Sequence, residues 1–126
     1  MEIKSAVTQS VAYGKEMTQR LFVYGTLVPG GPNEHVLNAI GGTWEEASVK
    51  GYLKQQGWGA ELGYPGIILD NTGDEINGYI FSSDKLDGHW DKLDDFEGEE
   101  YKRILIKVKT KNKMAKEAYI YILREI

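Results

Sequence analysis

The stretch Leu21-Phe22-Val23-Tyr24-Gly25-Thr26-Leu27-Val28-Pro29-Gly30-Gly31 decides the fold, because an apolar run suited to a β-strand leads directly into a glycine-rich break. Branched and aromatic residues from Leu21 to Tyr24 predict a buried strand. Gly25 removes the side chain where that strand ends, and Pro29-Gly30-Gly31 prevents its continuation. We therefore expect a core strand that is followed by a tight turn.

The backbone of this turn has two interpretations. Consecutive N–H groups of Gly25, Thr26 and Leu27 at a strand-to-loop junction would form a concavity suited to a carboxylate or carbonyl oxygen. The simpler alternative is a core strand that ends in a turn and binds nothing. The local pattern leaves both interpretations open, because one glycine turn is a weak signal.

Composition narrows the class of protein. The 126 residues fit one domain, and the net charge of −4 argues against a general nucleic-acid surface. The chain has no cysteine, which excludes thiol nucleophiles, thiolate metal sites and disulfides. No apolar run approaches the roughly 20 residues of a membrane span. We expect a cytoplasmic protein without nucleic-acid or membrane partners, whose oligomeric state the sequence does not indicate.

The order of the expected elements indicates the fold class. Residues 1–19 are polar and fit a loose N-terminal arm, a leader from an upstream start or one marginal strand, which leaves residues 20–126 as the domain. The expected strands cover residues 21–24, 44–58 (as one strand or two), 67–69, 75–81, 101–109 and 118–123. Turns are expected at 63–66 and at 70–74, the latter as a hairpin.

Two short helices separate these strands. Asn33 is expected to cap the first, which ends at Gly41-Gly42. Ser82 or Ser83 is expected to cap the second, which Gly98 ends. The second helix shows its buried face through apolar residues at helical spacing: Leu86, Trp90, Leu93 and Phe96. The whole order favours an α+β protein whose small, mixed and mostly antiparallel sheet curls into a barrel.

A dense acidic cluster surrounds the end of the second helix. Six carboxylates occur within ten residues, namely Asp91, Asp94, Asp95, Glu97, Glu99 and Glu100. A solvated acidic face explains most of them. Glu97 differs because the negative end of the helix macrodipole and the neighbouring carboxylates should both raise its pKa. A carboxyl group near neutrality is a candidate proton shuttle if it points into a cavity.

Other common forms of catalytic chemistry lack the residues that they need. No serine lies in a glycine-flanked nucleophile elbow, and His35 and His89 are isolated from each other, so neither a serine nucleophile nor a zinc site is indicated. The glycine-rich stretch lacks the Lys-Ser/Thr ending of a phosphate-binding loop. We therefore expect neither a metal nor a cofactor.

Several short motifs together resemble the γ-glutamylcyclotransferase-like family, over about Leu21 to Leu123. They are Tyr24-Gly25-Thr26-Leu27, Pro29-Gly30, Gly51-Tyr52, Tyr64-Pro65-Gly66, Gly78-Tyr79, Leu93-Asp94-Asp95-Phe96-Glu97-Gly98 and Tyr101-Lys102-Arg103. Single motifs are only modestly specific, whereas the first and the acidic one in a single small chain form a strong combination.

The resemblance implies roles for particular residues. Tyr24, Gly25, Thr26 and Leu27 match the loop that receives the glutamyl or oxoproline group, and Glu97 matches the catalytic glutamate. Tyr121 matches a tyrosine on the last strand that borders the pocket. The implied reaction converts a γ-glutamyl amide or amine to 5-oxoproline and a free amine. An alternative is a non-catalytic barrel that binds a small carboxylate, with Glu97 merely a surface acid.

Overall fold

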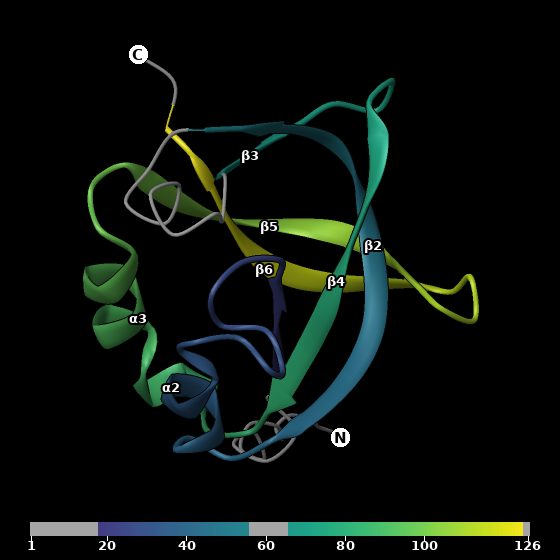
Figure 1. Cartoon of the computed structure of the whole chain (residues 1–126). Coiled ribbons are helices and arrows are strands. Elements are labelled where there is room, and N and C mark those ends of the chain that lie inside the picture. Colours follow the sequence, from purple (N-terminus) through teal and green to yellow (C-terminus); the bar gives the residue numbers. More distant parts are fainter. Residues whose placement is uncertain (1–17, 56–65, 125–126) are drawn as a thin grey trace, which may run out of the picture.

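The computed structural model describes residues 18–55 and 66–124, and Figure 1 shows the arrangement of their elements. The strands are β1 (Gln19–Val23), β2 (Thr43–Lys54), β3 (Gly66–Leu69), β4 (Asp74–Ser83), β5 (Tyr101–Thr110) and β6 (Ala115–Leu123). The helices are α2 (Glu34–Asn38), the single 3-10 turn η3 (Leu86–Gly88) and α3 (Trp90–Glu97).

Five of the strands close into a barrel. Their order is β2–β4–β1–β6–β5, and β5 returns to β2 through the pairs Ala47–Thr110 and Ser48–Lys109. β1 and β6 run parallel, and the other paired strands run antiparallel. β3 adds to β2 outside this ring. The predicted α+β class, with a mixed and mostly antiparallel barrel and short helices, is confirmed (Figure 1).

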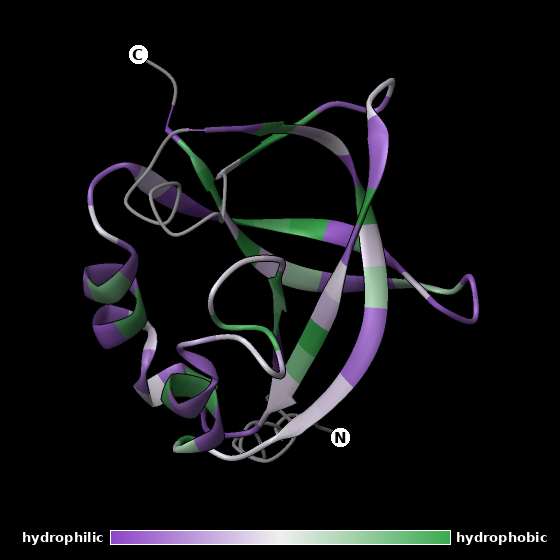
Figure 2. Ribbon diagram, viewed as in Figure 1, coloured by the Kyte–Doolittle hydropathy of each residue, from purple (hydrophilic) through white to green (hydrophobic). Residues whose placement is uncertain are grey.

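β1 is buried on both faces, which explains its continuous apolar sequence. Phe22 packs in a cluster to which all six strands contribute, which places it in the barrel interior. Leu21 and Val23 point to the opposite face and pack with residues of the helices, among them Leu37 and Leu93. Figure 2 shows hydrophobic residues on the sides of α2 and α3 that approach the barrel. The chain therefore has two apolar layers, and β1 belongs to both.

The turn at residues 70–73 does not connect a hairpin, so that prediction is wrong. β3 and β4 both pair with β2, and Gly51 lies opposite Leu69 of one strand and Asp74 of the other. The Asp70 carboxylate accepts hydrogen bonds from the Thr72 backbone N–H and hydroxyl, which stabilise the local turn. The turn thus interrupts a long antiparallel partner of β2.

The second helix begins later than predicted. β4 continues through Ser83, whose hydroxyl donates to the Gly41 carbonyl and accepts from the Lys85 N–H. The η3 turn follows, and α3 itself starts at Trp90. Its predicted end is confirmed, because Gly98 adopts φ of 89°, a conformation that residues with a side chain rarely take.

Other predicted features of the helices and strands agree with the structure only in part. Asn33 precedes α2 as predicted, but its side chain makes no capping hydrogen bond. β1 includes Gln19, one residue before the predicted start of the domain. The N-terminal arm up to residue 17, the strand segment 56–58 and most of the turn at 63–66 lie outside the described residues. No helix in the described ranges is both long and apolar enough to span a bilayer.

Candidate active site

The loop after β1 folds back on itself. The Val28 N–H donates to the Gly25 carbonyl at 3.3 Å, and the Asn33 N–H donates to the Thr26 carbonyl at 2.9 Å. Thr26 and Leu27 are buried. A side chain at Gly31 would place its Cβ 2.6 Å from the Thr26 carbonyl oxygen, so only glycine fits there. The predicted binding loop is therefore held in one compact conformation by its own backbone.

The Tyr24 hydroxyl joins this loop to two strands. It donates to the Tyr121 carbonyl on β6 at 2.8 Å and accepts from the Ile67 N–H on β3 at 3.1 Å. Burial raises the pKa of the phenol well above its usual value, which keeps it protonated. Tyr24 therefore has a clear architectural role, and its expected contact with a ligand stays a prediction.

Removing the Tyr24 hydroxyl should destabilise the fold. The Tyr24→Phe substitution would leave the Ile67 N–H and the Tyr121 carbonyl without their partner, at a cost of about 1–3 kcal/mol for a buried unsatisfied group. Urea denaturation would measure the change in the free energy of unfolding. Tyr52→Phe is the matched control, since Tyr52 is 46% exposed and should tolerate the change. Equal unfolding midpoints for both variants would contradict this role of Tyr24.

Glu97, the last residue of α3, has the raised pKa that the sequence predicts, but for a different reason. Desolvation by burial raises the pKa of its carboxyl group from 4.5 to about 7. The sequence instead points to the helix macrodipole and the neighbouring acids as the cause of the raised pKa. Phe96 in the last turn of the helix packs against the core cluster that includes Tyr101 and Leu123, and this packing limits the access of water to the neighbouring carboxyl group.

The structure brings Glu97 together with two other predicted site residues. The Glu97 charge contributes to the raised pKa values of both Tyr24 and Tyr121, so the three side chains lie within electrostatic range of one another. Tyr101, at the start of β5, acts on Tyr24 in the same way. Residues from α3, β5, β6 and the loop after β1 thus converge on one region.

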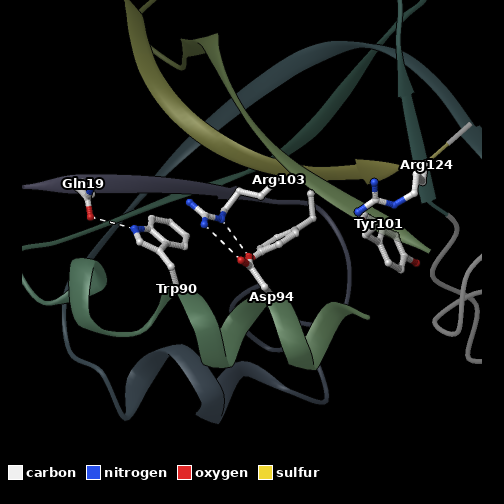
Figure 3. A network of polar contacts seen from close by, with 7 residues as sticks. Gln19, Trp90, Asp94, Tyr101, Arg103 and Arg124 are labelled. Atoms are coloured by element: carbon white, nitrogen blue, oxygen red, sulfur yellow. Dashed lines mark hydrogen bonds and ion pairs between the residues drawn. The ribbon is translucent and has the colours of Figure 1, made fainter. Parts of the chain in front are cut away.

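Asp94 belongs to a polar network that sequence reasoning missed. Its carboxylate accepts two hydrogen bonds from the Arg103 guanidinium, at 2.9 and 3.2 Å, and one from the Tyr121 hydroxyl at 2.6 Å. Figure 3 shows Arg103 lying between α3 and β5 with both bonds directed at Asp94. These bonds lower the pKa of Asp94, and the Arg103 bond has the largest effect. Asp94 is therefore a firmly ionised carboxylate and not one more solvated acid.

Two hollows adjoin these groups. One of about 690 Å³ lies beside the end of α3, and Tyr101, Arg103, Tyr121 and Arg124 contribute to its lining. Another of about 620 Å³ is lined in part by Tyr24. Neither of these two hollows is lined by Gly25, Thr26 or Glu97.

Within residues 18–55 and 66–124, no group of three or more histidine, aspartate or glutamate side chains is placed to share a metal ion. The region offers a carboxyl group with a pKa of about 7, that of Glu97, and the hydroxyl groups of Tyr24 and Tyr121.

Solved structures with the same fold exist. YkqA from Bacillus subtilis is 31% identical with a TM-score of 0.65, over 86% of this chain and 36% of that one. An AIG2-like protein from Mus musculus is 24% identical with a TM-score of 0.62, over 83% and 76% of the two chains. A structure described as gamma-glutamyl cyclotransferase is 17% identical with a TM-score of 0.57, over 86% and 68%. At their identities, the last two show likeness of fold alone.

The matched length differs between the solved structures and the family profile. This chain spans only about a third of the length of YkqA. No match was found among curated proteins. The sequence profile of the family described as gamma-glutamyl cyclotransferase, AIG2-like, matches residues 21–126, which is nearly all of the chain after its N-terminal segment. The chain therefore belongs to the gamma-glutamyl cyclotransferase, AIG2-like family.

Proposed function

We propose that this protein is a cyclotransferase that converts a γ-glutamyl amide to 5-oxoproline and a free amine. The observation that carries the proposal is the placement of Glu97, a desolvated carboxyl group with a pKa of about 7, within electrostatic range of Tyr24 at the head of the binding loop. Such a pKa suits a group that must take up and return a proton near neutral pH. Membership of the family supports the same reaction class.

The reaction needs no nucleophile from the protein. The α-amine of the substrate attacks its own γ-carbonyl carbon, forming the ring C–N bond, and the bond from that carbon to the leaving nitrogen then breaks. Because both reacting groups belong to one molecule, correct folding of the substrate supplies a high effective molarity, worth about 7–11 kcal/mol. This agrees with a chain that has no cysteine.

Proton transfer and charge stabilisation remain for the protein. Ionised Glu97 would accept a proton from the substrate ammonium group, which frees the amine to attack, and would return it to the leaving nitrogen. The Gly25, Thr26 and Leu27 N–H groups would stabilise the oxyanion that develops on the γ-carbonyl oxygen. The compact loop suits this task, because donors that are already fixed need no reorganisation during the reaction.

A panel of γ-glutamyl compounds tests the proposal. We would incubate the protein with γ-glutamylalanine, Nε-(γ-glutamyl)lysine and a γ-glutamyl alkylamide, and measure 5-oxoproline by mass spectrometry. Release of 5-oxoproline from at least one compound, abolished or strongly reduced in Glu97→Gln, is the expected result. Binding of a γ-glutamyl compound or 5-oxoproline without turnover of any compound would instead support a non-catalytic carboxylate-binding barrel.

Substitution in the binding loop should remove ligand affinity. Gly25→Val places a branched side chain where the substrate oxygens are proposed to approach the backbone, so calorimetry should detect no binding of 5-oxoproline. Gly88→Ala is the matched control, because a Cβ at Gly88 has no neighbour within 4 Å. Unchanged affinity in folded Gly25→Val protein would return the loop to a purely structural role.

A further inference from the structure

The Asp94–Arg103 pair is built more precisely than an ordinary surface ion pair. The Asp94 and Arg103 side chains are 42% and 25% exposed, and an ion pair with that exposure contributes little to stability by charge alone. This one is bidentate, and Asp94 also accepts the Tyr121 hydroxyl. Planar, two-bond geometry adds orientation to the attraction between charges.

Two aromatic rings also hold the Arg103 guanidinium in place. Its central carbon lies 4.4 Å from the centre of the Trp90 ring and 5.1 Å from that of the Tyr119 ring. The Trp90 indole N–H donates to the Gln19 side chain on β1 at 3.0 Å, so this support reaches the barrel wall (Figure 3). Arg103 is thereby fixed at the point where it binds Asp94.

Asp94 and Glu97 lie three residues apart and therefore one turn apart on α3. The helix has only eight residues and ends at Gly98. A helix of this length depends on packing for its order, since isolated helices so short are marginal in water. Bonds at Asp94 consequently restrain the same turn that carries Glu97.

We propose that Asp94 is a positioning residue, which clamps the last turn of α3 to β5 through Arg103 and to β6 through Tyr121 and so holds Glu97 against the Tyr24 loop. Tyr121 links both sides of the site, because its hydroxyl binds Asp94 while its carbonyl accepts the Tyr24 hydroxyl. This assignment rests on the proposed function for its catalytic consequence, but the placement of Glu97 can be measured without turnover.

The test uses the sign of a pKa change in the full-length protein. The Glu97 charge acts on Tyr24 in the loop after β1 and on Tyr121 of β6. Tyr101 on β5 acts on the same Tyr24, and Asp94 on α3 and Arg103 on β5 act on the same Tyr121. If Arg103 acted only through its charge, Arg103→Met would raise the pKa of Glu97, because a cation is lost. If Arg103 instead acts by holding α3, its removal loosens the last turn of the helix, water reaches the Glu97 carboxyl group, and the pKa of that group falls.

We would titrate the carboxyl carbon of Glu97 by NMR in protein labelled with ¹³C-glutamate, and use Glu97→Gln to assign the signal. Arg103→Met is expected to lower the pKa by about one unit or more, toward the ordinary carboxyl value. Arg103→Lys keeps the charge but loses the two-bond geometry, so it should give a smaller fall. Asp95→Asn, which removes a neighbouring charge without touching the clamp, is the control and should show no such fall.

An unchanged or raised pKa of Glu97 in Arg103→Met, or in Arg103→Lys should the first variant not fold, would overturn the positioning role. With γ-glutamylalanine as substrate, Arg103→Met should reduce kcat by about 10- to 100-fold with little change in KM, the scale of a misplaced catalytic group. A parent protein that turns over no γ-glutamyl compound would refute the proposed function, while the titration would still decide whether the Asp94–Arg103 pair positions Glu97.

Discussion

Replacing Glu97 with glutamine is expected to reduce turnover of a γ-glutamyl amide by about 100-fold or more, the usual scale for losing a general acid–base. Glutamine keeps the shape of the side chain but can neither accept the ammonium proton nor return it to the leaving nitrogen. Affinity for 5-oxoproline and the fold itself should persist. Steady-state kinetics and calorimetry on the same preparation would separate these effects.

Neighbouring acids provide the control for this substitution. Asp95 and Glu100 are both exposed, so Asp95→Asn and Glu100→Gln should have mild effects. Turnover by Glu97→Gln at the parental rate, together with a large loss in one of these controls, would show that the proton shuttle is a different carboxyl group.

The raised pKa of Glu97 leads to a prediction of how activity depends on pH. Glu97 must be ionised to accept a proton, so kcat/KM should fall as the pH drops through about 7, its pKa in the folded protein. Glu97→Gln should lack this acidic limb in its residual activity. A limb near pH 4.5 in the parent protein would mean that the carboxyl group is hydrated and not buried as described.

The free energy of unfolding should fall as the pH rises, whereas activity should increase over the same range. The pKa of Glu97 is higher in the folded protein than its ordinary 4.5, so the folded state binds the proton more tightly. Ionisation of Glu97 therefore destabilises the folded protein above pH 7. The cost is about 1.4 kcal/mol for each unit of difference between the folded and unfolded pKa values. It disappears below about pH 4.5, where the group is protonated in both states. Glu97→Gln is expected to be more stable than the parent at pH 8, and the gap in denaturation midpoint should close as the pH falls.

Blocking the α-amine of the substrate is expected to abolish the reaction completely. In ring closure this nitrogen is the nucleophile, and an acetylated nitrogen can neither be activated by Glu97 nor attack the γ-carbonyl. Water cannot take its place efficiently, because the tethered amine owes about 7–11 kcal/mol of its advantage to being held near the carbonyl. N-acetyl-γ-glutamylalanine should therefore release no alanine under conditions in which γ-glutamylalanine is consumed.

The comparison with free γ-glutamylalanine is the control for this experiment. Competition between the two compounds would show whether the blocked one still enters the site. Release of alanine from the acetylated compound at a rate near that of the free compound would exclude intramolecular attack and indicate hydrolysis.

The elements that the sequence predicts well are those whose signals are local. Leu21–Val23 is apolar at every position because β1 is covered on both faces. The burial of this strand can therefore be predicted from its own sequence, without knowledge of the strands that pair with it. Leu86, Trp90 and Leu93 are all buried in one cluster, as their spacing predicts, although Leu86 lies in η3 and not on α3. The direction in which the pKa of Glu97 moves also agrees with the sequence-based prediction.

Features that depend on distant contacts escape prediction. No local pattern shows that β3 and β4 share β2 as a partner, or that β5 closes the barrel on Ala47 and Ser48. The cause of the raised Glu97 pKa is hidden for the same reason, because desolvation depends on packing, whereas the helix end can be read directly. Asp94 and Arg103 are nine residues apart on different elements, and only the fold brings them together.

The most direct test of the proposed function is the identity of the first product formed in water enriched with ¹⁸O. Ring closure predicts 5-oxoproline without added ¹⁸O, because the γ-carbonyl carbon exchanges its leaving nitrogen for the substrate's own amine. Hydrolysis would place one ¹⁸O atom in free glutamate. Unlabelled 5-oxoproline as the primary product, lost in Glu97→Gln, is the predicted result, and ¹⁸O-labelled glutamate as the primary product would contradict it.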